Sequence, residues 1–313
     1  MNVLITGGAG FIGSHLCENL RNDKRIKKIY IIDNLKSGSK KNISVFLKNK
    51  KIKFIKQDIK NIKNIKNYFK NVSIVFHLAG LVDVANSINN PHKYIRNNVL
   101  GTLNVLECMR LYNVKKIIYA ASSSCYGNVG KNSISESQKI NPESPYAFTK
   151  NSAEELIKLF SIMNKINFIS LRLFNVYGPR AKMTGNYASV ISIFLRQKKN
   201  NKPLTIVGDG NQRRDFVHVA DVVEAFKRAS FSKNKNKIYN IGTGNSVTIN
   251  SIANIFGGKK KFISKRVGDL KFSKAKISKI KKDLKWVPKK KLKKSIQELI
   301  KNYVNYKLKW LKK

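Results

Sequence analysis

The sequence predicts an α/β fold in which a doubly wound parallel sheet carries helices on both faces and a smaller C-terminal α/β lobe follows. Three observations lead to this prediction. Short apolar runs alternate with segments of helical periodicity over the first two-thirds of the chain, a glycine-rich turn follows the first run, and the alternation weakens after Gly178-Pro179. Alternation of this kind is typical of a parallel sheet with two buried faces.

Each expected strand is a run of apolar residues, and each expected helix has apolar residues three or four positions apart. The strands are expected at residues 2–6, 28–33, 51–57, 73–79, 115–121 and 168–173, and a further one at 237–241. The helices are expected at residues 11–20, 62–69, 94–111 and 147–163. We therefore expect one unit over residues 1–175, with a return segment near 216–242. Most of residues 176–313 would form the smaller unit.

Composition restricts the class of protein. The 313 residues are 42% hydrophobic, which is enough for a sizeable core. The sequence contains no run of about 18 uncharged apolar residues, so it predicts no transmembrane helix, and its N-terminus lacks the pattern of a signal peptide. Cys17, Cys108 and Cys125 show neither metal-ligand spacing nor a disulfide framework. We expect a soluble protein of the reducing cytoplasm, without a metal site or membrane insertion.

The C-terminal segment 292–311 is predicted to be a basic helix with Ile296, Leu299, Ile300 and Tyr303 on one side. Such a helix could lie on a membrane surface. Packing of its apolar side on the smaller lobe is the favoured alternative.

The formal net charge of +46 has two interpretations. One is attraction to polyanions such as nucleic acid. The other is a bias toward Lys, Asn and Ile that scatters lysines over the surface. The segment 60–67 favours the second interpretation, because these three residue types alternate there without an arginine patch or aromatic platform. No specific nucleic-acid partner is expected, although a positive field would help to collect anionic substrates.

The turn Gly8-Ala9-Gly10-Phe11-Ile12-Gly13 lies between the first strand and the first helix. Glycines let the backbone approach a pyrophosphate, whose charge the helix N-terminus stabilises. Asp33 ends the second strand, where a carboxylate accepts hydrogen bonds from the adenosine ribose and repels a 2′-phosphate. This context favours a Rossmann-type NAD site over an ordinary tight turn, and NAD over NADP.

Tyr146 lies four residues before Lys150 at the start of a predicted helix, so the two side chains share one face. A tyrosine with a pKa of about 10 is a poor base near neutrality. A lysine cation and an oxidised nicotinamide nearby would both favour the phenolate, and lowering its pKa by about three units is equivalent to about 4 kcal/mol. Tyr-x-x-x-Lys pairs also occur on surface helices, so this one gains its weight from the fold around it.

A serine-rich loop, Ser122-Ser123-Ser124, directly follows a buried strand. Ligands of open α/β sheets bind beyond the carboxyl ends of the strands. A hydroxyl there could pass a proton between a substrate oxygen and Tyr146. The alternative is a loop that hydrogen-bonds its own backbone.

Six segments together resemble the extended short-chain dehydrogenase/reductases of the NAD-dependent epimerase/dehydratase family. Over nearly its full length the chain resembles the UDP-glucose and UDP-N-acetylglucosamine 4-epimerases of that family. The segments are residues 6–16, Asp33-Asn34-Leu35-Lys36-Ser37-Gly38, Gln57-Asp58-Ile59, His77-Leu78-Ala79-Gly80, the Tyr146/Lys150 pair and Arg172-Leu173-Phe174-Asn175-Val176-Tyr177-Gly178.

The resemblance implies three groups of site residues. The catalytic residues would be Tyr146, Lys150 and Ser122. The NAD contacts would be Gly7, Gly10, Phe11, Ile12, Gly13, Asp33, Asn34, Leu35, Lys36, Ser37, Gly38, Asp58, Ile59, Leu78, Ala79, Gly80, Asn97, Tyr146, Lys150 and Phe174. The UDP-sugar contacts would be Ser122, Ser123, Ser124, Tyr146, Asn175, Arg214, Arg266, Asp269 and Ser273. Val82 departs from the family pattern, because glucose epimerases carry a lysine there, and this bears on how tightly NAD is retained.

In the implied mechanism, Tyr146 takes the O4 proton of the sugar, directly or through Ser122, while the C4 hydride moves to NAD. Return of the hydride to the opposite face completes the inversion. The family's dehydratases carry an Asp-Glu pair where this chain has Ser123 and Ser124, which disfavours dehydration. A nucleotide-sugar reductase stays open, because it needs the same Tyr and Lys. A non-catalytic polyanion-binding protein is suggested by the charge alone.

Two further expectations follow from the resemblance. Ser273 falls where hexose-only enzymes carry a bulky tyrosine, so a small residue there predicts room for a 2-acetamido group. We therefore expect activity on UDP-GlcNAc/UDP-GalNAc as well as, or instead of, UDP-Glc/UDP-Gal. The family also implies a homodimer, formed by the helices at 94–111 and 147–163. Synthesis of an envelope or surface polysaccharide would fit such an activity.

Overall fold

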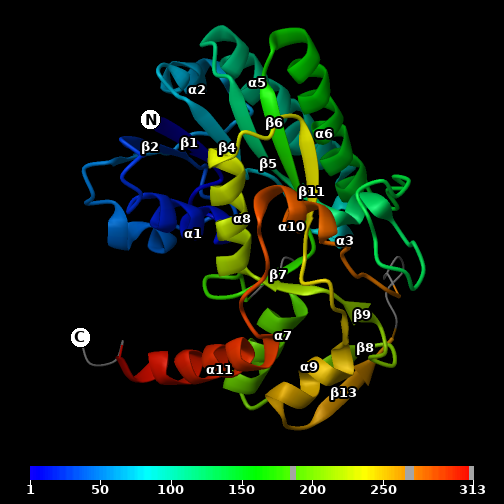
Figure 1. The fold of residues 1–313 in the computed structure, drawn as a ribbon. Coiled ribbons are helices and arrows are strands. Elements are labelled where there is room, and N and C mark those ends of the chain that lie inside the picture. The colour runs from blue at the N-terminus through cyan, green and yellow to red at the C-terminus, as the bar shows by residue number, and fades with distance from the viewer. Residues whose placement is uncertain (184–187, 265–270, 310–313) are drawn as a thin grey trace.

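The computed structural model describes residues 1–183, 188–264 and 271–309, with side chains described up to Tyr303. Within these residues a seven-stranded parallel sheet has the strand order β11-β6-β5-β4-β1-β2-β3 (Figure 1). Its strands are β1 (Asn2–Thr6), β2 (Lys28–Ile32), β3 (Ile52–Ile55), β4 (Ile74–His77), β5 (Lys116–Ser122), β6 (Asn167–Leu173) and β11 (Lys237–Ile241). The predicted doubly wound parallel sheet is confirmed.

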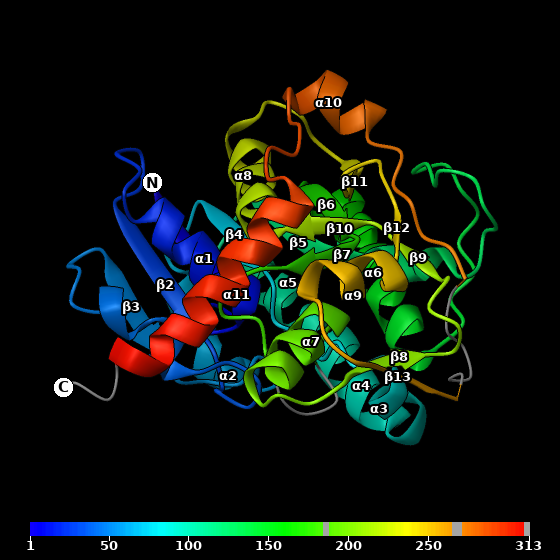
Figure 2. The ribbon, with the colours of Figure 1, turned by 90° about the horizontal axis from the view of Figure 1, so that it is seen from below.

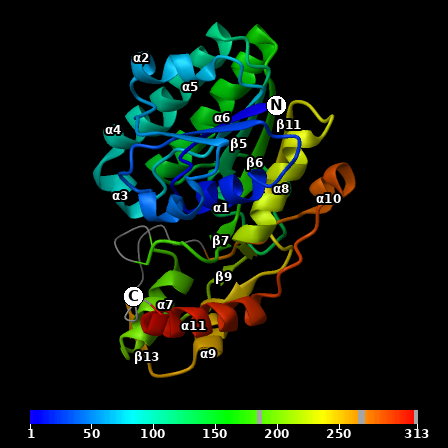
Figure 3. The same cartoon turned by 90° about the vertical axis from the view of Figure 1, so that its left-hand side faces the viewer.

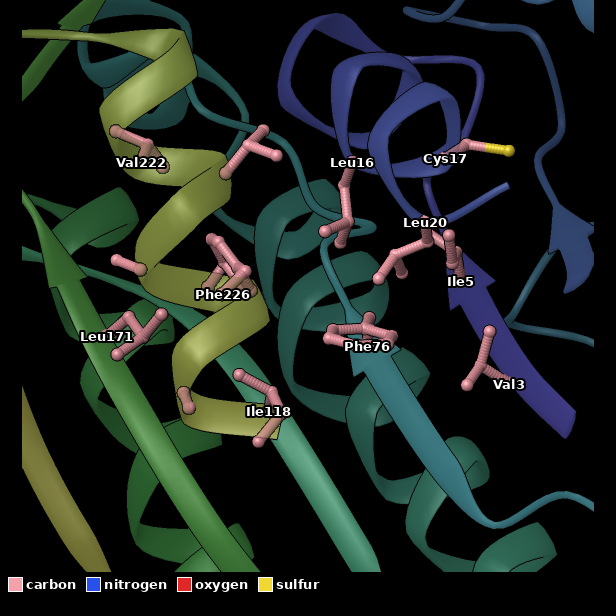
Figure 4. Packing of buried hydrophobic residues seen from close by; sticks show 14 of the residues in the cluster. Val3, Ile5, Leu16, Cys17, Leu20, Phe76, Ile118, Leu171, Val222 and Phe226 are labelled. Atoms are coloured by element: carbon pink, nitrogen blue, oxygen red, sulfur yellow. The ribbon is translucent and has the colours of Figure 1, made fainter. Parts of the chain in front are cut away.

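Two helical layers cover the sheet because its strands alternate their side chains between two cores. Val3 and Ile5 of β1 belong to one core, whereas Leu4 belongs to the other. Helices α1 (Phe11–Leu20) and α8 (Val219–Phe231) cover the first face, where Leu16 and Phe226 approach the strands (Figure 4). The other face is covered by α2 (Ile62–Ile65), η3 (Lys66–Phe69), α5 (Gly101–Leu111) and α6 (Pro145–Asn164).

The prediction of one continuous helix over residues 94–111 is wrong. In place of a single helix over residues 94–111, the chain forms α4 (Pro91–Tyr94), the π-helical segment η4 (Ile95–Leu100) and then α5. The segment 62–69 is likewise divided between α2 and a 3₁₀ turn, η3. Apolar spacing does not distinguish a regular α-helix from one with a π turn, and π turns occur frequently at functional sites. Short helices η1 (Lys40–Asn42), η2 (Ser44–Phe46), α3 (Val84–Asn89) and η5 (Ser123–Tyr126) complete this part of the chain.

A smaller lobe lies beyond the carboxyl ends of the strands (Figures 1 and 3). Its core includes Phe194, Ile206, Ile252 and Phe256. The helices are α7 (Val190–Lys199), α9 (Ile249–Phe256) and α11 (Leu292–Lys309), which lie in front of the sheet in the view from below (Figure 2). The short strand pairs are β8 (Leu204–Val207) with β13 (Lys260–Ile263), β9 (Arg213–Arg214) with β12 (Val247–Thr248), and β7 (Asn175–Tyr177) with β10 (Phe216–His218). Helix α10 (Ser278–Leu284) contacts β11.

The C-terminal helix packs on the smaller lobe, which confirms the alternative that the sequence favoured. Ile296 and Leu299 of α11 are buried in the core of the smaller lobe, and Ile300 and Tyr303 pack against the same core. These apolar side chains of α11 therefore contact the protein itself. The alternative that they lie on a membrane surface is wrong. Among the described residues, no helix combines the length and apolarity needed to cross a membrane.

Candidate functional site

A cavity of about 1250 Å³ lies where the carboxyl ends of the strands face the smaller lobe. The strand order reverses between β1 and β4, so the loops after these two strands leave the sheet in opposite directions. The cavity wall takes residues from both lobes, including Gly10 after β1, Ala79 after β4, Ser122 at the end of β5 and Arg214 of β9. Such a crevice at a switch point is where open α/β sheets bind their ligands.

In the glycine turn the backbone lies so close to neighbouring backbone atoms that Gly7 and Gly13 leave no room for a side chain. Gly7 has a φ of 70°, and a Cβ there would lie 2.7 Å from the backbone nitrogen of Ala79. A Cβ on Gly13 would overlap the carbonyl oxygen of Gly7. No side chain caps the N-terminus of α1, which begins at Phe11 after Gly10. Its first N–H groups are therefore available to an anion, and the turn fits a pyrophosphate.

Asp33 is held in the position expected of a ribose ligand. Its buried carboxylate accepts hydrogen bonds from the N–H groups of Ala9 at 2.9 Å and Leu35 at 2.8 Å. Burial raises the pKa of Asp33, and these two bonds oppose that rise. A Cβ on Gly38 would lie 2.9 Å from the same carboxylate, so glycine keeps the space beside it open. The residues present thus fit the adenosine end of NAD.

A second carboxylate lies near the edge of this region. Asp58 accepts hydrogen bonds from Asn34 Nδ2 and the Lys60 N–H, both at 3.0 Å, and forms ion pairs with Lys36 and Lys60 at 3.7 Å. Burial tends to raise the pKa of Asp58, but these bonds and charges outweigh it and the pKa is lowered. An ionised Asp58 therefore orients Asn34, which lines the cavity.

Tyr146 stands at the first turn of α6, in a position set by the helix start. Ser144 caps the helix by accepting a hydrogen bond from the Ala147 N–H at 3.1 Å, and Pro145 occupies the first turn. The Tyr146 N–H donates to Ser87 Oγ at 3.0 Å. Its side chain is buried, and the Ser122 and Ser124 hydroxyls act to lower the pKa of its phenol. These two serine hydroxyls are themselves 2.8 Å apart.

Burial dominates the electrostatics of the Tyr146/Lys150 pair. Burial raises the pKa of Tyr146, and the Ser122 and Ser124 hydroxyls only partly oppose the rise. The groups of the chain itself therefore raise the pKa of Tyr146, and the expected lowering, which also invoked an oxidised nicotinamide, stays a prediction. Lys150 is also buried, which lowers the pKa of its ammonium to about 7, although the charge of Glu154 acts in the opposite direction. The Lys150 ammonium lies 4.2 Å from the centre of the Tyr119 ring.

Sequence reasoning missed the residues that hold these side chains in place. Asn98, in the π-helical segment, donates to Thr149 Oγ1 and to the Leu81 carbonyl, both at 3.0 Å. Thr149 in turn donates to the Tyr146 carbonyl at 2.9 Å. The only signal for Asn98 was its place beside Asn97 within an otherwise apolar helical pattern. No sequence signal marked Ser87.

Most of the predicted site residues line the one cavity. The predicted cofactor residues on its wall are Gly7, Gly10, Phe11, Ile12, Gly13, Asp33, Asn34, Lys36, Ser37, Gly38, Ile59, Leu78, Ala79, Gly80, Asn97, Tyr146, Lys150 and Phe174. The predicted substrate residues on it are Ser122, Ser123, Ser124, Tyr146, Asn175, Arg214 and Ser273. Leu35 and Asp58 do not line it: the Leu35 side chain packs against the sheet core, and Asp58 acts through Asn34. Arg266 and Asp269 lie outside the described residues.

The charge of the cavity wall was predicted only in part. Beyond the expected Lys36, Lys150 and Arg214, the wall carries Lys60, Lys93, Arg180, Lys182 and Arg196. The carboxylates on the described wall are those of Asp33 and Asp83. This excess of cations suits a ligand with several phosphates.

Asp83 is a further residue that sequence reasoning missed. One of its carboxylate oxygens caps α3 by accepting from the Asn86 N–H at 2.9 Å. Its other oxygen is buried, and among the described residues it has no hydrogen-bond partner. Asp83 therefore places an acidic group at the part of the wall that Val82 and Val84 also form.

Comparison with known proteins identifies the family. The sequence profile of the NAD dependent epimerase/dehydratase family matches residues 3–242. The chain belongs to this family. It is 42% identical over 255 residues to a putative UDP-glucose 4-epimerase of Methanocaldococcus jannaschii, which covers 81% of this chain and 80% of the relative. The extended short-chain dehydrogenase/reductase resemblance is thereby confirmed.

Two solved structures of family members match nearly the whole chain. The UDP-glucose 4-epimerase of Thermotoga maritima with UDP-glucose has a TM-score of 0.92 at 32% identity, over 98% of this chain and 100% of that one. The UDP-N-acetylglucosamine 4-epimerase of Methanobrevibacter ruminantium in complex with UDP-N-acetylmuramic acid has a TM-score of 0.91 at 33% identity, over 97% and 98%. These relatives support a nucleotide-sugar epimerase or dehydratase, and their names differ in the sugar.

Proposed function

We propose that this protein is an NAD-dependent epimerase that inverts C4 of a UDP-hexose through a transient 4-keto sugar. The observation that carries the proposal is that the buried Tyr146 and Lys150 line one cavity wall together with Ser122, Ser124 and the glycine turn. In this proposal residues 1–175 and the segment near 216–242 hold NAD. Most of residues 176–313 hold the nucleotide sugar.

The chain supplies a base and a short proton path. Tyr146, as phenolate, takes the proton from O4 of the sugar, either directly or through the Ser122 hydroxyl. Burial opposes the phenolate, so it needs positive charge nearby. Protonated Lys150 is one source, and an oxidised nicotinamide is the other. NAD, when bound, would accept the hydride from C4 and return it to the opposite face of the sugar.

The nucleotide must stay fixed while the keto sugar turns over. Asn175 is held by the Asp215 carbonyl, which accepts from its N–H at 3.0 Å and its side-chain amide at 3.4 Å. Asp215 itself is buried and accepts from Thr243 and Ala275, so it fixes three segments around the cavity. We propose that Asn175 and Arg214, together with Arg266 and Asp269, bind the UDP moiety.

Two alternatives within the family use the same fold. Dehydration needs an acid and a base in the places of Ser123 and Ser124, and the Ser124 hydroxyl, which is neither, bonds with the Ser122 hydroxyl instead. A reductase would use Tyr146 and Lys150 to deliver a hydride once, and would consume NADH. The assembled Tyr146, Lys150 and Ser122 also disfavour a purely polyanion-binding protein.

The test is to incubate the purified protein with NAD and UDP-GlcNAc and to follow the anomeric protons by NMR while recording NADH absorbance. We expect UDP-GalNAc to appear without net accumulation or consumption of NADH. A parallel series with UDP-Glc and UDP-glucuronate measures which sugar is turned over fastest. Stoichiometric use of NADH would identify a reductase, and loss of water from the sugar would identify a dehydratase.

The sugar pocket yields a prediction about specificity. Ser273 is buried, lines the cavity and is fixed by a hydrogen bond from its N–H to the Arg213 carbonyl at 3.1 Å. We expect Ser273→Tyr to lower kcat/KM for UDP-GlcNAc about tenfold or more, because a ring would fill the space of the acetamido group. Turnover of UDP-Glc should persist, and Ser273→Ala should retain both activities. Undiminished UDP-GlcNAc turnover by Ser273→Tyr would reject this role.

We also propose a homodimer formed through the helices of the α5/α6 face. Large apolar side chains there are exposed: Leu111 is 59%, Leu159 49%, Ile162 81% and Met163 69% exposed. Exposed apolar groups on neighbouring helices are typical of an interface. Light scattering should report a dimer for the native protein and a monomer for Ile162→Asp. Val45→Asp, at an exposed apolar residue of η2, is the control and should remain dimeric; a native monomer would refute the proposal.

A further inference from the structure

A chain of hydrogen bonds fixes a neutral histidine beneath the cavity. Thr102 Oγ1 donates to the Asn98 carbonyl at 2.6 Å, so it accepts from His77 Nε2 at 2.8 Å. The other ring nitrogen, Nδ1, then accepts from Thr6 Oγ1 at 2.7 Å. Burial, together with the charge of Lys150, lowers the pKa of His77 to about 3. His77 is therefore an uncharged ring with both nitrogens satisfied.

The neutral His77 supports the ring of Tyr119. The two residues are paired neighbours on β4 and β5, and their rings stack with centroids 5.6 Å apart and an angle of 24°. Tyr119 is fully buried, and its hydroxyl donates to the Lys150 carbonyl at 3.3 Å. The Tyr119 ring is thus held from the sheet side by His77 and tied to α6 at Lys150.

The Lys150 ammonium lies over this ring rather than beside a carboxylate. Its distance to the ring centre is 4.2 Å. Glu154, one turn further along α6, forms its ion pairs with Arg172 at 2.5 Å and Lys158 at 3.9 Å. No carboxylate in the part of the chain that the structure describes forms an ion pair with Lys150. The face of an aromatic ring attracts a cation, and the attraction increases when the cation is desolvated.

We propose that Tyr119 is a positioning residue for Lys150. The face of the Tyr119 ring holds the Lys150 ammonium at the cavity wall, where a carboxylate would otherwise be needed. This inference rests on the proposed function in that Lys150 serves the reaction as an ammonium. A carboxylate in contact would compete with the Tyr146 phenolate for the cation, whereas a ring attracts the ammonium without adding a negative charge. A protonated His77 would oppose this arrangement, and its hydrogen bonds keep it neutral.

The first test compares the pH dependence of kcat/KM for epimerisation in variants of Tyr119. Without the ring, the pKa of Lys150 should fall by about one unit. Because the ammonium is the working form, the alkaline limb of the profile should move to lower pH by the same amount. Tyr119→Leu should show this shift, and Tyr119→Phe, which loses only the hydroxyl, should retain the native limb. Tyr119→Met serves as a second ring-less variant if the leucine variant does not fold. The other titratable groups around Lys150 are Glu154, Tyr146 and His77, which all variants keep.

The second test does not depend on turnover. Lysine labelled with ¹³C at Cε reports the titration of each ammonium by NMR, and Lys150 should be recognised because it titrates near pH 7, far below exposed lysines at about 10.4. Its signal is assigned by its loss in Lys150→Arg. A lower midpoint in the ring-less variants and a native midpoint in Tyr119→Phe support the inference. A native midpoint in the ring-less variants, or a shifted one in Tyr119→Phe, overturns it. A native protein that fails to epimerise sugars but shows the expected midpoints refutes only the proposed function.

Discussion

Tyr146→Phe is expected to lower kcat for UDP-sugar interconversion by about a thousandfold or more, with the fold and the binding of NAD retained. The substitution removes the hydroxyl that takes the O4 proton, and positioned acid-base groups contribute about 10²–10⁴-fold to a rate. The phenylalanine ring still fills the site between Leu81 and Tyr94, so packing is preserved. The measurement is single-turnover and steady-state epimerisation followed by NMR, with NAD binding measured in parallel by calorimetry.

Two further variants separate proton transfer from a general effect on structure. Ser122→Ala should reduce kcat less than Tyr146→Phe, because the phenolate can still take the proton directly. Tyr112→Phe is the matched control, since its hydroxyl bonds to Asn67 on the surface and should leave turnover unchanged. If Tyr146→Phe interconverted the sugars at the native rate, the proposed base would be wrong and the epimerase mechanism with it.

The layout of the sheet could be predicted because buried parallel strands are short runs of Val, Ile and Phe, as in Asn2–Thr6 and Ile74–His77. The glycine turn and Asp33 could be predicted for a related reason. The conformation of the turn depends on a few consecutive residues, and Asp33 directly follows a predicted strand. That Tyr146 and Lys150 share one face of a helix follows from their spacing, whereas their role was inferred from the fold around them and from the family resemblance. These features all depend on a few neighbouring positions of the chain.

The features that could not be predicted depend on tertiary contacts. The π turn at Ile95–Leu100 leaves the apolar spacing unchanged, yet it places Asn98 against Thr149 of α6. Tyr119 has the pattern of an ordinary strand residue, and only the packing of α6 on β5 brings it under Lys150. The direction of the Tyr146 pKa depends on burial, which a sequence pattern does not quantify.

Arg172→Met is expected to lower the free energy of unfolding by about 3–5 kcal/mol, because it removes the closer of the two cations that pair with the buried Glu154 carboxylate and leaves only Lys158 at 3.9 Å. The side chains of Arg172 and Glu154 are 3% and 2% exposed, and the two atoms of the ion pair are 2.5 Å apart. Burial opposes the charged form of Arg172, but the bonds and charge of Glu154 outweigh it and raise the Arg172 pKa. Arg172 also donates to the Tyr126 hydroxyl at 2.9 Å, so the substitution disturbs η5 as well. Urea unfolding of the two proteins at pH 7 measures the difference.

Two controls decide whether the buried charge is the cause. In the double variant Glu154→Leu/Arg172→Met no charge is left unpaired, so it should be more stable than Arg172→Met alone. Arg110→Met breaks an ion pair with Glu107 of 2.7 Å, but its side chains are 54% and 33% exposed, and stability should hardly change. An equal deficit in the double variant would assign the loss to packing around Arg172 instead. Because Glu154 lies one turn from Lys150 and its charge raises the pKa of that ammonium, the double variant should also lower the pKa of the proposed catalytic lysine.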